Sequence, residues 1–154
     1  MTHHKRQQRL ERLGEFARQE EDKAARLMAE ARARLDEQEQ RLALLENYQR
    51  EYAARLSFNT GASAGVFALQ NYRAFMARIE EAVVQQRQSV ERAAREHAHT
   101  VQTWNEQRTR TRGLDKVGEK LATTMAREQN SRDQRAQDEF AGRLHLSTLT
   151  PHRG

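Results

Sequence analysis

The strongest run of charge in the sequence is a basic cluster near residue 110. Arg108, Arg112 and Lys116 are spaced four residues apart, so a helix places them on one face, where like charges repel slightly. That face has the chemistry to bind phosphate or an acidic protein surface, although a charge run is more often a solvated helix face. No aromatic residue alternates with these arginines to stack on bases, and no zipper follows them. We therefore expect no nucleic acid partner.

The histidines and carboxylates do not have the spacing of a reaction centre. His97 and His99 are two residues apart, whereas a metal site on a helix needs pairs three or four residues apart. The acidic residues, such as Glu80 and Glu81, have basic residues nearby and no opposed partner across a cleft. The sequence also lacks a P-loop, a dinucleotide-binding glycine pattern and a nucleophile elbow. It predicts no metal, no cofactor and no enzymatic activity.

The aromatic residues form the second candidate site. Tyr48 and Tyr52 are one helical turn apart, and Tyr72 and Phe75 follow a stretch rich in small residues. Two helices cannot bury a wide apolar stripe, so these rings are predicted to be partly exposed. They either pack the end of a helical hairpin or bind a partner, since exposed aromatic residues are enriched in protein interfaces.

Long helices are needed to position these residues. From Leu69 to Trp104 the apolar residues repeat with alternating steps of three and four, which is the pattern of a coiled-coil seam. The first half of the chain has its own seam, at Leu35, Gln38, Leu42, Leu45, Tyr52 and Leu56. The predicted fold is all-α, a long two-helix antiparallel coiled-coil hairpin in one domain, with the second helix longer than the first.

The predicted boundaries are a first helix over 5–56, a loop over 57–65, a second helix over 66–142 and an irregular tail over 147–154. Folding about Gly61 pairs Gln38 with Val83 and Leu45 with Met76. The same register leaves 119–144 without a partner inside the chain, next to a soft point at Gly113 and Gly118. A thinner seam is predicted near the N-terminus, where alanines bury little area, at Leu10, Leu13, Ala17, Ala24, Leu27, Met28 and Ala31.

The composition agrees with a narrow helical seam. Among the 154 residues, 36% are hydrophobic and 32% are charged, and the mean hydropathy is −1.05. This is too little apolar material for a large globular core. The chain has no cysteine, and no apolar run approaches the roughly 20 residues that a membrane span needs. The net charge of +5 comes from 27 basic and 22 acidic residues, and we expect a cytoplasmic protein.

Several segments resemble one known family, the flagellar FliJ proteins. They are Leu45-Glu-Asn-Tyr-Gln-Arg-Glu-Tyr52, Asn71-Tyr-Arg-Ala-Phe75, Ile79-Glu-Glu-Ala82, Gln85-Gln-Arg87, Trp104 and Gln137-Asp-Glu-Phe-Ala-Gly-Arg143. The resemblance covers roughly 5–143. It implies an antiparallel coiled coil similar to the central stalk of rotary ATPases, in the flagellar type III export apparatus. The implied partners are the export ATPase hexamer, the membrane protein of the export gate and the export chaperones, which place the protein at the inner membrane through its partners.

The resemblance also implies two binding sites. The positions that match the gate-binding face of the family are Leu45, Tyr48, Tyr52, Phe75, Ile79 and Ala82. The free ends of the hairpin would enter the ATPase ring, with contacts at Leu13, Arg108, Arg112 and Lys116. Three alternatives stay open at this point. They are an unrelated coiled-coil scaffold or tether, the equivalent stalk of a virulence secretion system, and a basic coil that binds nucleic acid.

Overall fold

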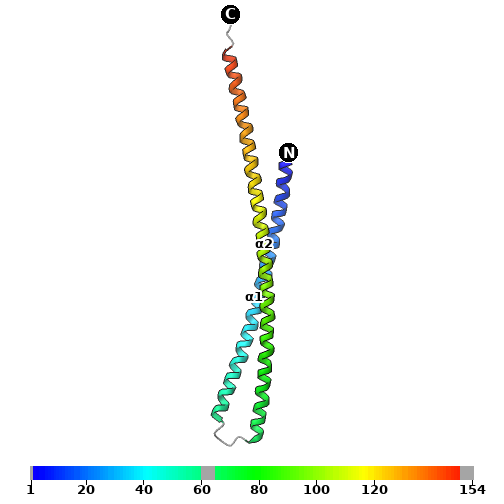
Figure 1. Cartoon of the computed structure of the whole chain (residues 1–154), viewed down its shortest axis with the longest axis vertical. Helices are drawn as coiled ribbons and strands as arrows, with labels where there is room; N and C mark the ends of the chain where they lie inside the picture. Colours follow the sequence, from blue (N-terminus) through cyan, green and yellow to red (C-terminus); the bar gives the residue numbers. More distant parts are fainter. Residues whose placement is uncertain (1, 60–64, 150–154) are drawn as a thin grey trace. The chain divides into compact units, whose positions relative to one another are not determined.

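The protein consists of two long α-helices. The computed structural model describes residues 2–59 and 65–149. Helix α1 spans Thr2–Asn59 and α2 spans Val66–Leu149, with no strand among the described residues (Figure 1). The carbonyl of Gly65 accepts hydrogen bonds from the amides of Ala68 and Leu69 at the start of α2. The predicted all-α class, with the second helix longer than the first, is confirmed.

The chain divides into two compact units, and each contains part of both helices. We call Met1–Gln19 with Arg108–Gly154 the terminal unit, and Glu20–Gln107 the central unit. In both units, residues that come later in α1 contact residues that come earlier in α2, so the two helices are antiparallel. The contacts that establish this are His3–Glu128 and Arg18–Asp115 in the terminal unit, and Arg34–Glu96 and Tyr52–Tyr72 in the central unit.

A heptad seam runs along each helix without interruption. The buried and half-buried positions alternate by four and three residues, which is the spacing of positions a and d in a coiled coil. On α2 this confirms the predicted seam from Tyr72 to Trp104 and continues it into the terminal unit, whereas Leu69, where the seam was predicted to begin, is exposed. The seam positions of α2 are Tyr72, Met76, Ile79, Val83, Gln86, Val90, Ala93, His97, Thr100, Trp104, Gln107, Thr111, Leu114, Gly118, Leu121, Met125 and Glu128.

The seam of α1 includes four small residues among larger ones, at Gly14, Ala17, Ala24 and Ala31. Its most buried members are three alanines spaced seven residues apart, Ala17, Ala24 and Ala31, together with Leu35. Small seam residues let helix backbones approach closely but remove little apolar area from water, at roughly 25 cal/mol per Å². No large side chain among the described residues is completely buried. The predicted seam near the N-terminus is thus present at its alanines, which remove little apolar area from water.

The side chains beside the seam form two flanks. In an antiparallel coiled coil, position e of one helix faces position e of the other, and g faces g. We call the first side, with the neighbouring b positions, the e/b flank, and the second side, with the c positions, the g/c flank. The ion pairs agree with this assignment. Arg18–Asp115 (3.5 Å) and Glu46–Arg87 (3.5 Å) join e positions, and Arg34–Glu96 (2.8 Å) joins g positions.

The predicted register of the hairpin is wrong by several residues. The side-chain amide of Gln86 donates to the backbone carbonyl of Gln38 at 3.0 Å and to its side-chain oxygen at 2.8 Å. The sequence had paired Gln38 with Val83 instead. The reason is the length of α1, which continues to Asn59. The centre of the hairpin therefore lies beyond Gly61, and each residue of α1 meets one farther along α2.

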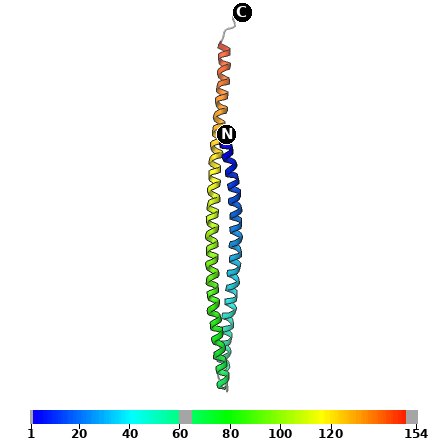
Figure 2. The same ribbon diagram turned by 90° about the vertical axis from the view of Figure 1, so that its right-hand side faces the viewer.

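The same shift shortens the part of α2 that has no partner. Leu121 is buried, Met125 is half-buried and Glu128 contacts His3 at 3.3 Å, so the prediction that 119–144 lacks a partner is wrong for its first third. From Ser131 to Thr148 every residue is exposed. In the terminal unit, α2 extends past the beginning of α1 in both views (Figures 1 and 2).

Several predicted boundaries also need correction. Helix α1 begins at Thr2 and includes 57–59, where the sequence predicted the loop, while 60–64 lie outside the described residues. Helix α2 passes through Gly113 and Gly118 and ends at Leu149, so 147–149 are helical where an irregular tail was predicted. The rest of that tail, 150–154, also lies outside the described residues. Glycine lowers helix stability, but the seam on either side of these residues keeps the helix intact.

Two residues assigned to the N-terminal seam belong to its flank. Leu13 and Leu27 are exposed, and both occupy g positions. The seam position beside Leu13 is Gly14, which is buried against α2. The sequence assignment followed apolar character, whereas the heptad phase set by Ala17 and Ala24 places a glycine at this point of the seam.

Replacing Gly118 by alanine is expected to raise the free energy of unfolding by about 1 kcal/mol, because alanine is the better helix former by that amount. A Cβ atom at this position meets nothing within 4 Å. Urea unfolding followed by circular dichroism measures the change. Gly113→Ala, at an exposed position that is equally open, isolates the helix-propensity contribution. If Gly118→Ala lowers the free energy of unfolding while Gly113→Ala does not, the seam at Gly118 has no room for a Cβ atom and the prediction is wrong.

Candidate functional site

The aromatic residues of the central unit form a connected cluster. The rings of Tyr48 and Tyr52 stack with centroids 5.6 Å apart, and Tyr52 contacts Phe75 of the other helix at 4.6 Å. The hydroxyl of Tyr72 donates to the backbone carbonyl of Tyr52 at 3.3 Å, and the guanidinium of Arg55 lies 5.7 Å from the centre of the Tyr52 ring. Tyr52 is thus the centre of the cluster, because its ring contacts Tyr48 and Phe75 and its backbone carbonyl accepts a hydrogen bond from Tyr72.

The six residues predicted to bind an export gate lie on one side of the central unit. Leu45, Tyr52 and Ile79 occupy d positions, and the other three, Tyr48, Phe75 and Ala82, occupy g positions. Positions d and g are neighbours on a heptad helix, and g faces g across the pair. We call this set the aromatic face. It combines half-buried seam residues with exposed flank residues, so the structure brings the predicted residues together.

Burial divides the aromatic face into two roles. Ile79 is only 8% exposed and belongs to the seam, whereas Tyr48 is 52% exposed. Leu45, Tyr52 and Ala82 are half-buried. Packing of the hairpin thus accounts for the buried members of the face, while a partner-binding patch stays a prediction for the exposed ones. A partner can contact Tyr48 and Phe75 without opening the seam.

One exposed apolar residue beside the aromatic face was missed. Leu44 is one helical turn before Tyr48 on the same flank, and it is among the most exposed large hydrophobic residues. Its c position lies outside the seam, so a search for seam residues passes over it. Two polar positions nearby have partners within the chain. Gln86 is bonded to Gln38, and Arg41 pairs with Glu37 at 2.8 Å.

The four residues predicted to contact an ATPase ring lie in the terminal unit, but not in one cluster. Arg108 and Arg112 occupy e and b positions, and Lys116 follows them on the outer face of α2. Leu13 occupies a g position on the other flank of the seam. Arg112, Lys116 and Leu13 are exposed, while Arg108 is half-buried. The structure therefore keeps the arginine row together and places Leu13 apart from it.

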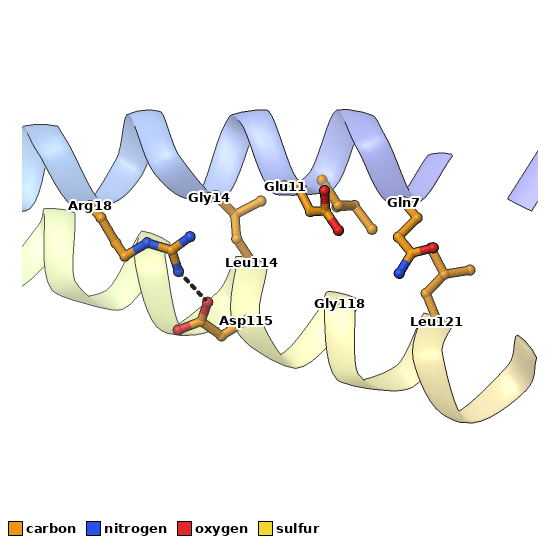
Figure 3. Close-up of a pocket in the computed structure, with 9 residues that line it drawn as sticks. Gln7, Glu11, Gly14, Arg18, Leu114, Asp115, Gly118 and Leu121 are labelled. Carbon is orange, nitrogen blue, oxygen red and sulfur yellow. Dashed lines mark hydrogen bonds and ion pairs between the residues drawn. The ribbon is translucent and has the colours of Figure 1, made fainter. Parts of the chain in front are cut away.

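A shallow hollow of about 210 Å³ opens on the e/b flank of the terminal unit. It exists because two seam positions that would normally hold large side chains are Gly14 and Gly118 (Figure 3). The ion pair between Arg18 and Asp115 borders it at one end. The hollow is lined by Gln7, Leu10, Glu11, Gly14, Arg18, Leu114, Asp115, Gly118 and Leu121.

The described residues give no sign of a metal centre or a membrane span. Within residues 2–59 and 65–149, no group of three histidine, cysteine or acidic side chains is arranged to hold a metal ion. His97 occupies a half-buried seam position and His99 is exposed, as their spacing suggested. Neither described helix has a stretch that is long and apolar enough to cross a bilayer.

Comparison with known proteins identifies the family. The profile of the family described as "Flagellar FliJ protein" matches residues 6–149, which is most of both helices. The chain belongs to the flagellar FliJ family. The Flagellar FliJ protein of Escherichia coli (strain K12) is 32% identical over 136 residues, covering 87% of this chain and 91% of that protein. The Flagellar FliJ protein of Salmonella typhi is 29% identical over 137 residues, covering 89% of this chain and 93% of that protein.

The match to the FliJ family confirms the resemblance noted in the sequence. Every residue of the aromatic face, and all four residues of the predicted ring contact, lie within the matched range 6–149. The match does not assign a partner to either set. The roles of these residues in binding therefore stay predictions, and so does the absence of enzymatic activity.

The two roles within the aromatic face can be separated by stability measurements. Ile79→Ala is expected to lower the free energy of unfolding by about 3 kcal/mol, because it removes a buried side chain from the seam. Tyr48→Ala should cost less than about 1 kcal/mol, because half of the ring is already in water. Urea unfolding followed by circular dichroism compares the two. Equal losses would mean that Tyr48 is structural.

Proposed function

We propose that this protein is the stalk of a flagellar type III export apparatus. In this role it binds within the ring of the export ATPase, promotes assembly and activity of that ring, links it to the export gate and helps to recycle export chaperones. The observation that carries the proposal is the match to the FliJ family over 6–149, on a chain whose two helices pair antiparallel in both units. Both curated relatives are flagellar, which favours this role over a virulence-type stalk.

We assign the contact with the export gate to the aromatic face. Its exposed members, Tyr48 and Phe75, offer apolar area without disturbing the seam, and Leu44 extends the surface by one helical turn. Aromatic residues of this kind supply much of the binding energy in protein interfaces. Because the gate belongs to a membrane, this contact would hold the protein peripherally at the inner membrane from the cytoplasmic side.

We assign the contact with the ATPase ring to the terminal unit. The seam there includes the small residues Gly14, Ala17 and Gly118, and the outer surface of the unit is strongly charged. A slender charged hairpin end suits the pore of a ring. Arg108, Arg112 and Lys116 provide one row of cations for acidic groups lining that pore, and Leu13 provides a separate apolar contact.

The unrelated-scaffold alternative differs in its oligomeric state. A scaffold that dimerises through these heptads requires each seam to pair with another chain. Within both units the seam of α1 is instead occupied by α2, as the Gln38–Gln86 and Arg18–Asp115 contacts illustrate. The stalk proposal accordingly expects a monomer in light scattering after gel filtration. An obligate dimer would favour the scaffold.

Tyr48→Ala is expected to weaken binding to the cytoplasmic domain of the cognate gate protein by about tenfold, which corresponds to about 1.4 kcal/mol for an interface aromatic residue. Isothermal titration calorimetry measures the affinity. Val84→Ala is the matched control, since Val84 is exposed to the same extent but lies at a b position away from the aromatic face. Both variants should keep the helical circular dichroism of the parent. Loss of helicity in Tyr48→Ala, or an equal effect of Val84→Ala, would contradict the assignment.

Addition of the protein to its cognate export ATPase is expected to accelerate ATP turnover at a fixed ATPase concentration, because a stalk promotes assembly of the ring. A variant that lacks 133–154 tests the part of α2 without a partner, while retaining the His3–Glu128 contact and the whole seam. If that segment enters the ring, the truncated protein will stimulate less. If neither protein changes turnover nor co-elutes with the ATPase, the stalk proposal fails.

A further inference from the structure

The g/c flank of the terminal unit carries basic residues and no acidic ones along the paired part of the two helices. Eleven residues occupy its g and c positions, and they include five arginines or lysines and no acidic residue. The basic residues are all exposed, and none makes an ion pair with a described residue. The positions are Thr2, Arg6, Arg9, Leu13, Phe16, Arg110, Gly113, Val117, Lys120, Thr124 and Arg127.

The other flank of the same unit does not share this character. Its e and b positions carry three basic residues and four acidic ones, and two of them form the Arg18–Asp115 ion pair. The charged residues of this e/b flank are Glu11, Glu15, Arg18, Arg108, Arg112, Asp115 and Glu119. The g/c flank of the terminal unit thus carries basic residues without acidic ones, whereas the e/b flank carries charges of both signs. A one-sided field favours a partner of opposite charge.

Three exposed apolar side chains lie on the basic flank. Leu13 and Phe16, one helical turn apart on α1, are 52% and 60% exposed, and Val117 of α2 is 43% exposed. Leu13 and Val117 both occupy g positions, and the Arg34–Glu96 pair of the central unit shows how such positions face each other across two helices. Apolar residues held on both helices of a pair form a site into which a third helix can pack.

A hollow on this flank provides a socket beside the apolar residues. It has a volume of about 230 Å³ and receives residues from both helices, with Val117 and Leu121 supplying apolar walls and Arg6 and Lys120 supplying charge. His3 and Thr124 complete it. A side chain from a packed helix fills such a hole in the way that knobs fill holes in coiled coils, while neighbouring acidic residues reach the arginines.

From these observations we propose that the g/c flank of the terminal unit binds an acidic amphipathic helix of a partner protein. The apolar stripe of that helix contacts Leu13, Phe16 and Val117, and its Asp and Glu residues face Arg6, Arg9 and Lys120. An acidic helix is the partner that best matches the basic residues of the flank, and its apolar side chains match the hollow between the two helices. Nucleic acid binding is less suited, since Phe16 is the sole aromatic residue at the g and c positions of this flank and no row of stacking rings is present. The site shares Leu13 with the proposed ring contact, but it is argued from the charge, the exposed apolar residues and the hollow of this flank.

The proposal is tested with a synthetic fluorescent peptide about three heptads long, with leucine at a and d and glutamate at e and g. Fluorescence anisotropy measures its affinity for the full-length protein. The parent protein should bind the acidic peptide, and should not bind a matched peptide with lysine in place of glutamate. Arg9→Glu combined with Lys120→Glu should weaken binding at least tenfold, and Phe16→Ala about fivefold. The test variants leave Leu13 unchanged, so stimulation of the ATPase is an independent readout.

Matched control variants distinguish binding at this site from nonspecific binding to any exposed charge or apolar side chain. Arg95→Glu changes an exposed arginine of the central unit, and Val84→Ala removes an exposed apolar side chain there, so neither should alter peptide binding. All variants must retain the helical circular dichroism of the parent. The proposal is overturned if the acidic peptide does not bind, or if the controls weaken it as much as the flank variants. It is also overturned if oligo-dT, or vesicles of equal parts phosphatidylglycerol and phosphatidylcholine, bind through these residues while the peptide does not.

Discussion

The structure depends on a seam that only two helices share. Each helix can turn one narrow stripe of positions toward the other, and in α1 the most buried large-to-small series of that stripe is Leu35 with Ala31, Ala24 and Ala17. Close approach of the backbones replaces the wide core of a globular domain. All residues outside the seam stay on the surface, including large apolar ones such as Phe16 and Leu44. In such a protein a surface apolar residue is therefore a normal consequence of the architecture, and a binding site must be argued from grouping and charge.

Polar residues in the seam fix the register of the two helices, which alanine residues alone specify only weakly. A row of small residues packs almost equally well in several registers, whereas the Gln38–Gln86 hydrogen bonds form in only one. A buried polar group at a seam position generally fixes register at some cost in stability. Tyr52 acts in a similar way nearer the end of α1, because its backbone carbonyl and its ring are both engaged by residues of α2. The two contacts together determine which residues of the helices stand opposite each other in the central unit.

The sequence was sufficient to predict the helices and the seam wherever apolar residues mark it, as Met76, Ile79 and Val83 do. It also placed Gln38 and the alanines Ala17, Ala24 and Ala31 in the seam, but it failed at some other small or polar seam positions. Gly14 holds a seam position beside the exposed Leu13, and Thr111 is buried in α2 although its side chain is polar. The register was missed because it depends on where α1 ends, and Asn59 carries no signal strong enough to fix that point. The residues of the aromatic face were found, but their division into buried and exposed members required the structure.

The unbroken heptad repeat also restricts how the length of the chain can change. Each residue inserted into an α-helix rotates everything beyond it by about 100°. A single insertion in α1 would therefore turn the aromatic face or the basic flank away from its side of the pair. A change of one whole heptad nearly restores the phase, and it must be matched in α2 so that opposite positions still meet. Helices of this type can thus lengthen or shorten only in paired steps of two turns, while the end of α2 beyond Glu128, which has no partner in the seam, is free of that restriction.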